Sequence, residues 1–425
     1  MAAHRVTPLH HPIDAVVVVP GSKSIANRAL ICAALAEGTS TFSNVPDGDD
    51  TEAMVTCLEL LGVGVGRAES VGEPTTVRGT GGVLAPGPIA LPTRLAGTTS
   101  RFITALASLG PGPYDIDGAP PLRARPMAPL HDALVTLGAS LQAGERWGHL
   151  PVTVSGPLRG ASHIGVAGDV SSQFITALML IGPYVPGGLR IAITTRLVSS
   201  PYLEITKSVM ADFGHDAVTI DDNNVIYVGA GKYRSRDFTI EPDASSASYP
   251  LAAAAICGGR VEVPDLTIRA VQGDAGFCDV LATMGCVATR GERSTIVESG
   301  ERLNGVDIDM VEMSDLVPTL AAAAVFAETP TRIRGVGFIR AKESDRLGDL
   351  CTELRRLGAQ ATETDDGLVI EPAVLHGSRV ATHHDHRLAM AFGLIGLRVA
   401  DVEVDDPDVV SKSWPGYWRV LGSLQ

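Results

Sequence analysis

The sequence is poor in aromatic residues and in positive charge, and both shortages exclude classes of function. Phe, Trp and Tyr make up 4% of the 425 residues, too few for the aromatic platforms on which single-stranded nucleic acids stack. The 34 basic residues are outnumbered by 48 acidic ones, which gives a net charge of −14. Because such a chain repels phosphate backbones and anionic lipid surfaces, we expect no nucleic-acid and no membrane partner.

Paired cysteines and long apolar runs are also missing. The six cysteines form no C-x-x-C pair and have no regular spacing, so neither a disulfide framework nor a zinc site is predicted. No apolar run reaches the roughly 18 residues of a membrane span. The first twenty residues lack the pattern of a signal peptide. A cytoplasmic location, in a reducing compartment, is therefore expected.

Lysine is scarce among the basic residues, since 29 of them are Arg and five are Lys: Lys23, Lys207, Lys232, Lys342 and Lys412. A preference for GC-rich codons would produce this bias without functional meaning. The positions are informative all the same, because Lys23, Lys342 and Lys412 fall in polar motifs that are candidate binding sites.

A polar cluster that opens an Ala-rich apolar run occurs six times, beginning at residues 22, 97, 170, 244, 314 and 385. Each cluster offers Ser, Thr or Asp as a helix cap, so each run is predicted to be a buried helix. A second, amphipathic helix follows each run and ends at a large apolar residue and a glycine cap, at Gly62, Gly138, Gly214, Gly285, Gly358 and Gly422.

These glycines are 64 to 76 residues apart, which predicts six α/β units and most simply two domains of three units, with the midpoint near residue 240. The stretch Gly62–Gly66 resembles a dinucleotide loop, but it follows a helix and not a strand, so we interpret it as a cap.

The six predicted helix starts carry more polar and basic residues than capping needs. Lys23, Arg28, Arg101, Gln173 and Asp315 lie there, as does the pair His386 and Arg387. Helix N-termini with Lys and Arg side chains bind phosphate and carboxylate groups. Although Pro20–Ser24 resembles an ATPase P-loop, Ser22 and Val17 stand where that loop needs glycine, so a phosphate or carboxylate contact is predicted there instead.

Five further motifs are candidates for the same anion site, each with an ordinary structural alternative. Arg123 and Arg125 lie in a loop bounded by proline, and Ser171, Ser172 and Ser199 stand at helix starts where capping alone would explain them. Lys342–Arg346 reads equally well as a solvated helix start, and Lys412 as a solvated lysine. The run His383–Arg387 is not expected to bind metal, because zinc-binding histidines are three to five residues apart.

In combination these motifs resemble the 5-enolpyruvylshikimate-3-phosphate synthase family. They occur in the family's order and cover nearly the whole chain. They are Pro20–Ser24 with Asn27 and Arg28, Ala96–Thr98 with Arg101, Arg125–Pro126, Ser171–Phe174, Asp243–Tyr249, Lys342–Arg346 and Asp385–Arg387.

The resemblance implies an α/β fold of two pseudo-threefold domains, each an inside-out α/β barrel of three βαβαββ units, joined by a two-strand crossover. It implies one domain from residues 21–240 and another from 1–20 with 241–425. It also implies a cytoplasmic monomer that needs no cofactor and no metal.

The activity implied by the resemblance belongs to the shikimate pathway of aromatic amino-acid biosynthesis. The enolpyruvyl group of phosphoenolpyruvate is transferred to the 5-hydroxyl of shikimate 3-phosphate, and phosphate leaves through a tetrahedral intermediate. Asp315 matches the base for the hydroxyl proton, Glu343 matches the acid for the methylene carbon, and Lys23 is a third catalytic candidate. The implied substrate-binding residues are Lys23, Ser24, Arg28, Gly97, Arg125, Ser171, Ser172, Gln173, Ser199, Asp315, Lys342, Arg346, Arg387 and Lys412.

Three positions depart from the usual family pattern, namely Leu95, Phe102 and Phe338. They affect fine contacts and the affinity for glyphosate, for which Gly97 leaves room. A related transferase acting on UDP-N-acetylglucosamine is the alternative. That family generally has Cys, or occasionally Asp, in the loop before its Arg-Pro and Asn directly after its first Lys, whereas the loop Gly110–Arg125 contains no Cys and Ser24 follows Lys23. A non-catalytic binding protein of the same fold is the other alternative, and Asp315, Glu343 and Lys23 argue against it.

Overall fold

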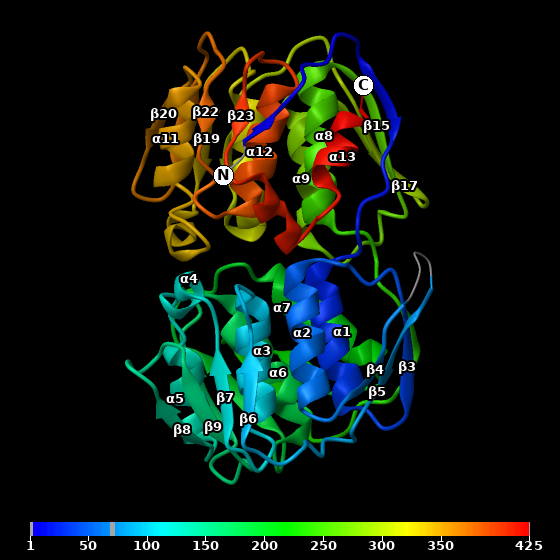
Figure 1. Ribbon diagram of the computed structural model, residues 1–425, viewed down its shortest axis with the longest axis vertical. Coiled ribbons are helices and arrows are strands. Elements are labelled where there is room, and N and C mark those ends of the chain that lie inside the picture. Colours follow the sequence, from blue (N-terminus) through cyan, green and yellow to red (C-terminus); the bar gives the residue numbers. More distant parts are fainter. Residues whose placement is uncertain (1–2, 69–72, 425) are drawn as a thin grey trace. The chain divides into compact units, whose positions relative to one another are not determined.

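The computed structural model describes residues 3–68 and 73–424. Contacts divide it into two compact units (Figure 1). One unit consists of Gly21–Ile240 and is called the inserted unit, because the other unit is built from Met1–Pro20 and Glu241–Gln425 on either side of it. We call the second the split unit. The chain thus passes from one unit to the other twice.

Each predicted Ala-rich run forms a buried helix. In the inserted unit these are α1 (Lys23–Leu35), α3 (Gly97–Ala107) and α6 (Ser172–Ile181); in the split unit they are α8 (Ala244–Cys257), α10 (Val317–Ala324) and α12 (His386–Gly396). Ser22, Ser171, Asp243 and Asp385 accept hydrogen bonds from the first free N–H groups of α1, α6, α8 and α12. Residue type predicted the caps at Ser22, Ser171 and Asp385, whereas the fourth cluster was expected to begin at Ala244 and the cap of α8 is Asp243.

One helix start was predicted wrongly. The sequence indicated that the fifth run begins at Ser314, whereas α10 begins at Val317 and Asp315 lies in the preceding 3-10 helix η3 (Val311–Leu316). Pro318 explains the shift, because proline is favoured in the first turn of a helix, where its missing N–H has no partner to lose.

The amphipathic helices end at the predicted glycines in five of six cases. They are α2 (Asp49–Leu60), α5 (Ala128–Thr136), α7 (Pro201–Asp212), α9 (Phe277–Thr283), α11 (Gly348–Arg356) and α13 (Tyr417–Gly422). Gly62, Gly138, Gly214, Gly285 and Gly358 have positive φ angles of 80° to 110°, as a C-terminal glycine cap requires. The prediction is wrong for Gly422, which is the last residue of α13 itself and is followed by Ser423 as cap.

Each unit carries three sheets on the outside of its helices (Figure 1). Five sheets of the described chain have four strands, with one parallel pair followed by two antiparallel pairs. In the inserted unit they join β14 (Asp237–Thr239), β3 (Thr39–Ser43), β5 (Thr75–Arg78) and β4 (Gly64–Gly66); β6 (Ile89–Pro92), β7 (Tyr114–Asp117), β9 (Val152–Ser155) and β8 (Ser140–Ala143); and β10 (His163–Val166), β11 (Leu189–Ile193), β13 (Val225–Val228) and β12 (Val218–Ile220).

The sheets of the split unit follow the same pattern, with one shorter member. They join β2 (Ile13–Val16), β15 (Gly259–Pro264), β17 (Ser294–Glu298) and β16 (Val287–Arg290); β18 (Asp307–Asp309), β19 (Thr331–Arg334), β21 (Leu368–Glu371) and β20 (Gln360–Glu363); and β1 (His4–Arg5), β23 (Glu403–Val404) and β22 (Arg379–Val380). The recurring topology confirms the six α/β units expected from the glycine spacing.

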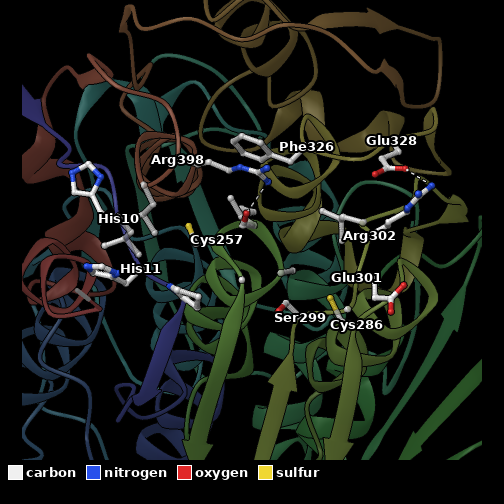
Figure 2. A pocket seen from close by; sticks show the side chains of 18 residues that line it. His10, His11, Cys257, Cys286, Ser299, Glu301, Arg302, Phe326, Glu328 and Arg398 are labelled. Carbon is white, nitrogen blue, oxygen red and sulfur yellow. Dashed lines mark hydrogen bonds and ion pairs between the residues drawn. The ribbon is translucent and has the colours of Figure 1, made fainter.

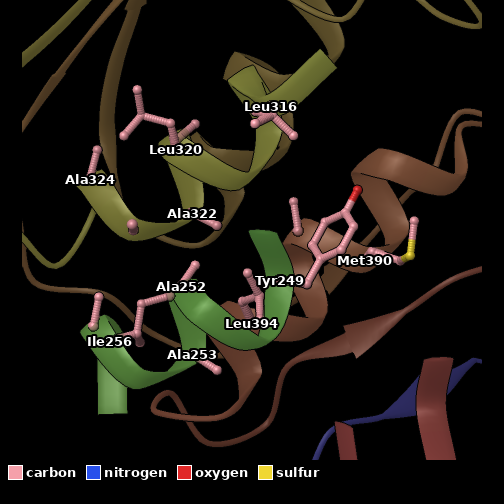
Figure 3. Close-up of a cluster of buried hydrophobic side chains, with 14 of the residues drawn as sticks. Tyr249, Ala252, Ala253, Ile256, Leu316, Leu320, Ala322, Ala324, Met390 and Leu394 are labelled. Carbon is pink, nitrogen blue, oxygen red and sulfur yellow. The ribbon is translucent and has the colours of Figure 1, made fainter. Parts of the chain in front are cut away.

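The core of the split unit is the contact of α8, α10 and α12 (Figure 3). Small side chains such as Ala252, Ala253 and Ala322 are fully buried there, and Leu320 and Leu394 fill the remaining space. Because alanine lets helix backbones approach closely, three helices can meet along one line. Their N-terminal ends, which carry Asp243, Asp315 and Asp385, therefore come together.

Within residues 3–68 and 73–424, no helix combines the length and apolar character that crossing a membrane requires.

Candidate active site

In the split unit, one buried arginine gathers three carboxylates. Arg346 is 1% exposed and lies just before α11. Its Nη1 donates to Asp315 Oδ1 at 2.9 Å, its Nη2 to Glu343 Oε2 at 2.7 Å, and its Nε to Asp385 Oδ2 at 2.6 Å. Buried charges persist when they are paired and hydrogen-bonded. Arg346 thus fixes the two predicted catalytic carboxylates, Asp315 and Glu343, relative to each other.

Two more cations hold Asp315. Arg387, in the first turn of α12, donates from Nη2 to Asp315 Oδ2 at 2.9 Å, and Lys342 Nζ lies 3.5 Å from Asp315 Oδ1. Burial opposes ionisation of Asp315, but the charges of Arg387, Lys342 and Arg346 outweigh it and keep its pKa well below the ordinary value. Asp315 is therefore an ionised carboxylate, the form that accepts a proton.

Glu343 also has a lysine partner. Lys412 Nζ donates to Glu343 Oε1 at 2.9 Å, from the end of the 3-10 helix η5 (Pro407–Lys412). The two side chains are 8% and 16% exposed. Asp315, Glu343 and Lys412 come from three separate motifs of the sequence. Arg346 joins Asp315 to Glu343, and Glu343 in turn binds Lys412.

The inserted unit holds a second group of predicted residues at the N-termini of its helices. Lys23 Nζ, at the start of α1, donates to Asp50 Oδ2 on α2 at 2.9 Å. Thr99 on α3 donates from Oγ1 to the Asp50 carbonyl at 3.0 Å. Gln173 on α6 donates from Nε2 to Thr98 Oγ1 at 3.3 Å. Contacts of α2 and α3 therefore join the first turns of α1 and α6.

Gly97 lies against two guanidinium groups. A methyl group added at Gly97 would lie 2.5 Å from Arg125 Nη1 and 2.8 Å from Arg101 Nη1. Arg101 is anchored to the Gly97 carbonyl at 2.8 Å and lies over the Phe174 ring at 5.3 Å. The missing side chain of Gly97 is what leaves Arg125 room at the N-terminus of α3.

Arg28 is 2% exposed and connects helices. It donates to Thr206 Oγ1 on α7 at 2.9 Å and to the Ser24 carbonyl at 2.7 Å, and its guanidinium lies 5.5 Å from the Phe102 ring centroid. Burial lowers its pKa to about 10. Phe102, one of the departures from the family pattern, thus packs against Arg28; a substrate contact for Arg28 stays a prediction.

The remaining predicted residues of the inserted unit lie at helix starts. Ser171 caps α6 through Gln173 N, at 3.3 Å, and Ser172 is buried in the first turn. Ser199 is also buried, has a φ of 57° and precedes α7. Capping of α6 alone can explain why a serine stands at position 171, which is the structural alternative given above for this residue.

The other two departures differ in their surroundings. Phe338 belongs to the 3-10 helix η4 (Gly337–Ala341), and Lys342 Nζ lies 5.8 Å from its ring centroid. A cation over an aromatic face is attracted to it, so Phe338 helps to hold Lys342 in place. Leu95 is 41% exposed.

Sequence reasoning missed the carboxylates that pair with the predicted cations. Asp50 and Asp385 are buried, yet each stood in the sequence as an ordinary helix-start acid. Asp385 does have a signal, since it directly precedes His386 and Arg387 in a motif already singled out. Asp50 has none, because its partner Lys23 lies 27 residues away.

Two of the three histidines in the run His383–Arg387, His383 and His384, contact carboxylates of the split unit. His383 Nε2 lies 2.9 Å from Glu353 Oε1, and His384 Nδ1 lies 3.3 Å from Asp406 Oδ2. Both histidines have positive φ angles, and their rings reach different carboxylates. The run therefore has a structural role at the entrance to α12.

A cavity of about 410 Å³ lies in the split unit where α8 and α12 end, opposite the ends that carry Asp243 and Asp385 (Figure 2). Arg398 donates to the Ile256 carbonyl at 2.9 Å and lies over Phe326, while Arg302 pairs with Glu328. Its cations thus have partners within the unit, and none of the predicted site residues lines it.

Comparisons with known proteins show the family to which the chain is similar. The family model described as EPSP synthase (3-phosphoshikimate 1-carboxyvinyltransferase) matches residues 9–421. Proteins named 3-phosphoshikimate 1-carboxyvinyltransferase from Trichormus variabilis and Methanoculleus marisnigri are 42% and 39% identical, over 96% of this chain and of theirs.

Solved structures give the same answer for the fold. An EPSP synthase from Acinetobacter baumannii superposes with a TM-score of 0.82 at 26% identity, covering 99% of this chain and 97% of that one. The enolpyruvyl transferase NikO from Streptomyces tendae, at 17% identity and a TM-score of 0.77 over 99% and 96% of the two chains, shares the fold. The motifs, the two-unit fold and the full-length match establish that the chain belongs to the EPSP synthase (3-phosphoshikimate 1-carboxyvinyltransferase) family.

Proposed function

We propose that this protein is the transferase that moves the enolpyruvyl group of phosphoenolpyruvate to the 5-hydroxyl of shikimate 3-phosphate and releases phosphate. The observation that carries the proposal is the buried Arg346, which bonds Asp315 and Glu343 at 2.9 and 2.7 Å. An enolpyruvyl transfer needs a base for the hydroxyl and an acid for the methylene carbon, and this arrangement supplies two carboxyl groups at fixed positions.

Asp315 is the proposed base. It is ionised, and its three cationic partners Arg346, Arg387 and Lys342 also suit the phosphate and carboxylate groups of the substrates. When these anionic groups bind the cations, they neutralise part of the positive charge that keeps the Asp315 pKa low. The proton affinity of Asp315 then rises at the moment when the hydroxyl must lose its proton.

Glu343 is the proposed acid, with Lys412 as its neighbour at 2.9 Å. Proton transfer from Glu343 to the methylene carbon makes the adjacent carbon electron-poor, and the substrate oxygen attacks it while Asp315 takes the hydroxyl proton. The tetrahedral product then returns a proton from its new methyl group to Glu343 and expels phosphate, which takes up the proton held by Asp315; the carbon–carbon double bond is regenerated and both carboxyl groups regain their starting forms. Atoms and charges balance without an oxidant or a reductant.

The inserted unit supplies the other proposed substrate contacts. Most of them lie at or beside the N-termini of α1, α3 and α6, namely Lys23, Ser24, Gly97, Arg125, Ser171, Ser172 and Gln173. The other two are buried: Arg28 lies within α1, and Ser199 precedes α7. Free N–H groups, the positive ends of the helix dipoles and cationic side chains together favour small multiply charged anions. Lys23, whose side chain is 16% exposed and whose ammonium group pairs with Asp50, is also a candidate for proton transfer.

We also propose that the inserted and split units are two domains, and that the protein is a cytoplasmic monomer working without metal or cofactor. The free state of its six cysteines is consistent with a reducing compartment. Expression of residues 21–240 alone tests the first proposal, light scattering tests the monomer, and turnover after chelation tests independence from metal.

The activity is tested by phosphate release on mixing the protein with phosphoenolpyruvate and shikimate 3-phosphate. UDP-N-acetylglucosamine as acceptor is the matched control. Release with shikimate 3-phosphate alone supports the proposal, and release with only the nucleotide sugar would assign the protein to the rival reaction. Absence of release with either acceptor would favour a binding protein.

A further inference from the structure

A fourth carboxyl group, that of Asp274, lies on an element that packs against η3, the element that carries Asp315, and it has no part in the mechanism above. Asp274 is 6% exposed and belongs to the 3-10 helix η2 (Gly273–Gly276). Within the described residues its carboxyl group receives one hydrogen bond, from Ser245 Oγ in the first turn of α8, and forms no ion pair. A buried carboxyl group without a cationic partner is costly to ionise, so its presence beside a catalytic carboxylate needs an explanation.

The position of Asp274 is firmly fixed. The side chain of its neighbour Gln272 accepts a hydrogen bond from Ala244 N at 3.1 Å and donates to Glu241 Oε1 at 2.8 Å and to the Pro242 carbonyl at 2.7 Å. These bonds tie η2 to the N-terminus of α8. On its other side η2 packs against η3, the element that carries Asp315.

Charges from each neighbouring element act on Asp274. The carboxylates of Asp315 on η3 and Asp243 before α8 oppose its ionisation, whereas Arg387 on α12 and the Ser245 hydroxyl favour it. From α9, the Cys278 thiol donates to the Ala275 carbonyl, and burial raises its pKa to about 12, so it stays neutral. Burial and the Asp315 charge together raise the pKa of Asp274 to about 7.

We propose that Asp274 is a positioning residue whose charge sets the proton affinity of Asp315. The interaction between two neighbouring carboxyl groups is mutual: a negative charge on either raises the proton affinity of the other. When Asp274 is neutral, the charges of Arg387, Lys342 and Arg346 dominate around Asp315, and it is a weak base. When Asp274 is ionised, its negative charge partly offsets Arg387, and Asp315 becomes a stronger base for the substrate hydroxyl.

The proposal rests on the role of Asp315 as the proton acceptor, and it predicts the direction in which the rate changes with pH. Asp274 is protonated below its pKa and ionised above it, so the rate of the chemical step should rise with pH through this range. The rise is expected at or above pH 7, because bound anionic substrates add negative charge that favours the protonated form. One pKa unit of coupling changes the proton affinity of Asp315 by about tenfold.

Asp274→Asn is the direct test, because asparagine has the shape of the protonated acid and can still accept the Ser245 hydrogen bond. The single-turnover rate of phosphate release with phosphoenolpyruvate and shikimate 3-phosphate is measured from pH 6 to 9. The wild-type rate should rise with pH. The rate of the variant should stay at about the value that the wild-type protein has at low pH, so that at pH 9 the variant is about tenfold slower than the wild-type protein. An unchanged pH profile in the variant would overturn the proposal.

Ser245→Ala provides a second test that does not depend on the folding of the first variant. The Ser245 hydroxyl stabilises ionised Asp274, so its removal should move the rise in rate to higher pH without abolishing it. A shift to lower pH, or none, would contradict the proposal. The proposed function fails separately: Asp315→Ala with full turnover would remove Asp315 from the base's role, and absence of wild-type turnover would refute the activity itself.

Discussion

Replacing Asp385 with asparagine should destabilise the split unit, because it removes the most buried of the carboxylate charges that pair with Arg346. The Asp385 side chain is 0% exposed and that of Arg346 is 1% exposed, with 2.6 Å between Arg346 Nε and Asp385 Oδ2. Asparagine keeps the shape of aspartate and caps a helix equally well. The cap bond from Arg387 N should therefore survive, so that the variant isolates the loss of charge.

The size of the effect follows from the other partners of Arg346. Removing one partner of a buried ion pair costs about 3–5 kcal/mol when the remaining charge is left unpaired. Arg346 keeps Glu343 at 2.7 Å and Asp315 at 2.9 Å, so its charge stays largely compensated. We expect a loss of about 1.5–3 kcal/mol in the free energy of unfolding, the range of a hydrogen bond to a charged group.

Urea unfolding followed by far-UV circular dichroism measures this loss. Glu328→Gln is the matched control, because it removes an ion pair of the same unit in which Arg302 and Glu328 are 72% and 54% exposed. The control should change the unfolding free energy by about 0–1 kcal/mol. Equal effects in the two variants would refute the reasoning, since they would mean that burial of the Asp385–Arg346 pair adds nothing.

Three further predictions concern the site and the stability of the inserted unit. Gly97→Ala should raise both KM for phosphoenolpyruvate and the glyphosate concentration for half-inhibition, because its methyl group would lie 2.5 Å from Arg125 Nη1; steady-state inhibition with an unchanged glyphosate response would contradict this. Glu343→Gln should slow single-turnover phosphate release by about 10²-fold or more while substrate affinity, measured by calorimetry, changes far less. Burial lowers the pKa of His131 from 6.5 to about 4. As the pH falls, the unfolded state therefore binds a proton before the folded state does, and about 3 kcal/mol of the free energy of unfolding should be lost between pH 6.5 and 4. Urea unfolding at several pH values measures this loss, which should be smaller in His131→Phe.

Much of the fold could be predicted from the sequence because its signals are local. Caps such as Ser22 and Asp385 and glycines such as Gly62 and Gly138 act within one turn of their own helix, so residue type is enough to find them. Gly422 misled the same reasoning because α13 continues through it. Asp315 was placed in a helix start because the turn before Pro318 has no signal of its own.

The candidate site could be predicted only in part, because its partnerships join residues far apart in the chain. The cationic and catalytic residues stood in motifs, but the residues that position them did not. Asp385 pairs with Arg346 across 39 positions, and Arg28 with Thr206 across 178. Asp274 was missed for a similar reason, since the charge that acts on it, Asp315, comes from another repeat.

The division of the chain has a consequence for its synthesis. Strand β2 finds its parallel partner in β15, where Val16 stands opposite Glu262, and β1 pairs with β23 near the C-terminal end. At the usual rate of about 5–20 residues per second, the ribosome needs on the order of ten to forty seconds to make the inserted unit after β2 has emerged. The inserted unit, made from one continuous stretch, can fold during that interval, while the first strands of the split unit must stay unpaired. Nascent chains are therefore most open to chaperone capture at their first twenty residues, and a circular permutation that moves this segment to the C-terminal end should shorten the wait.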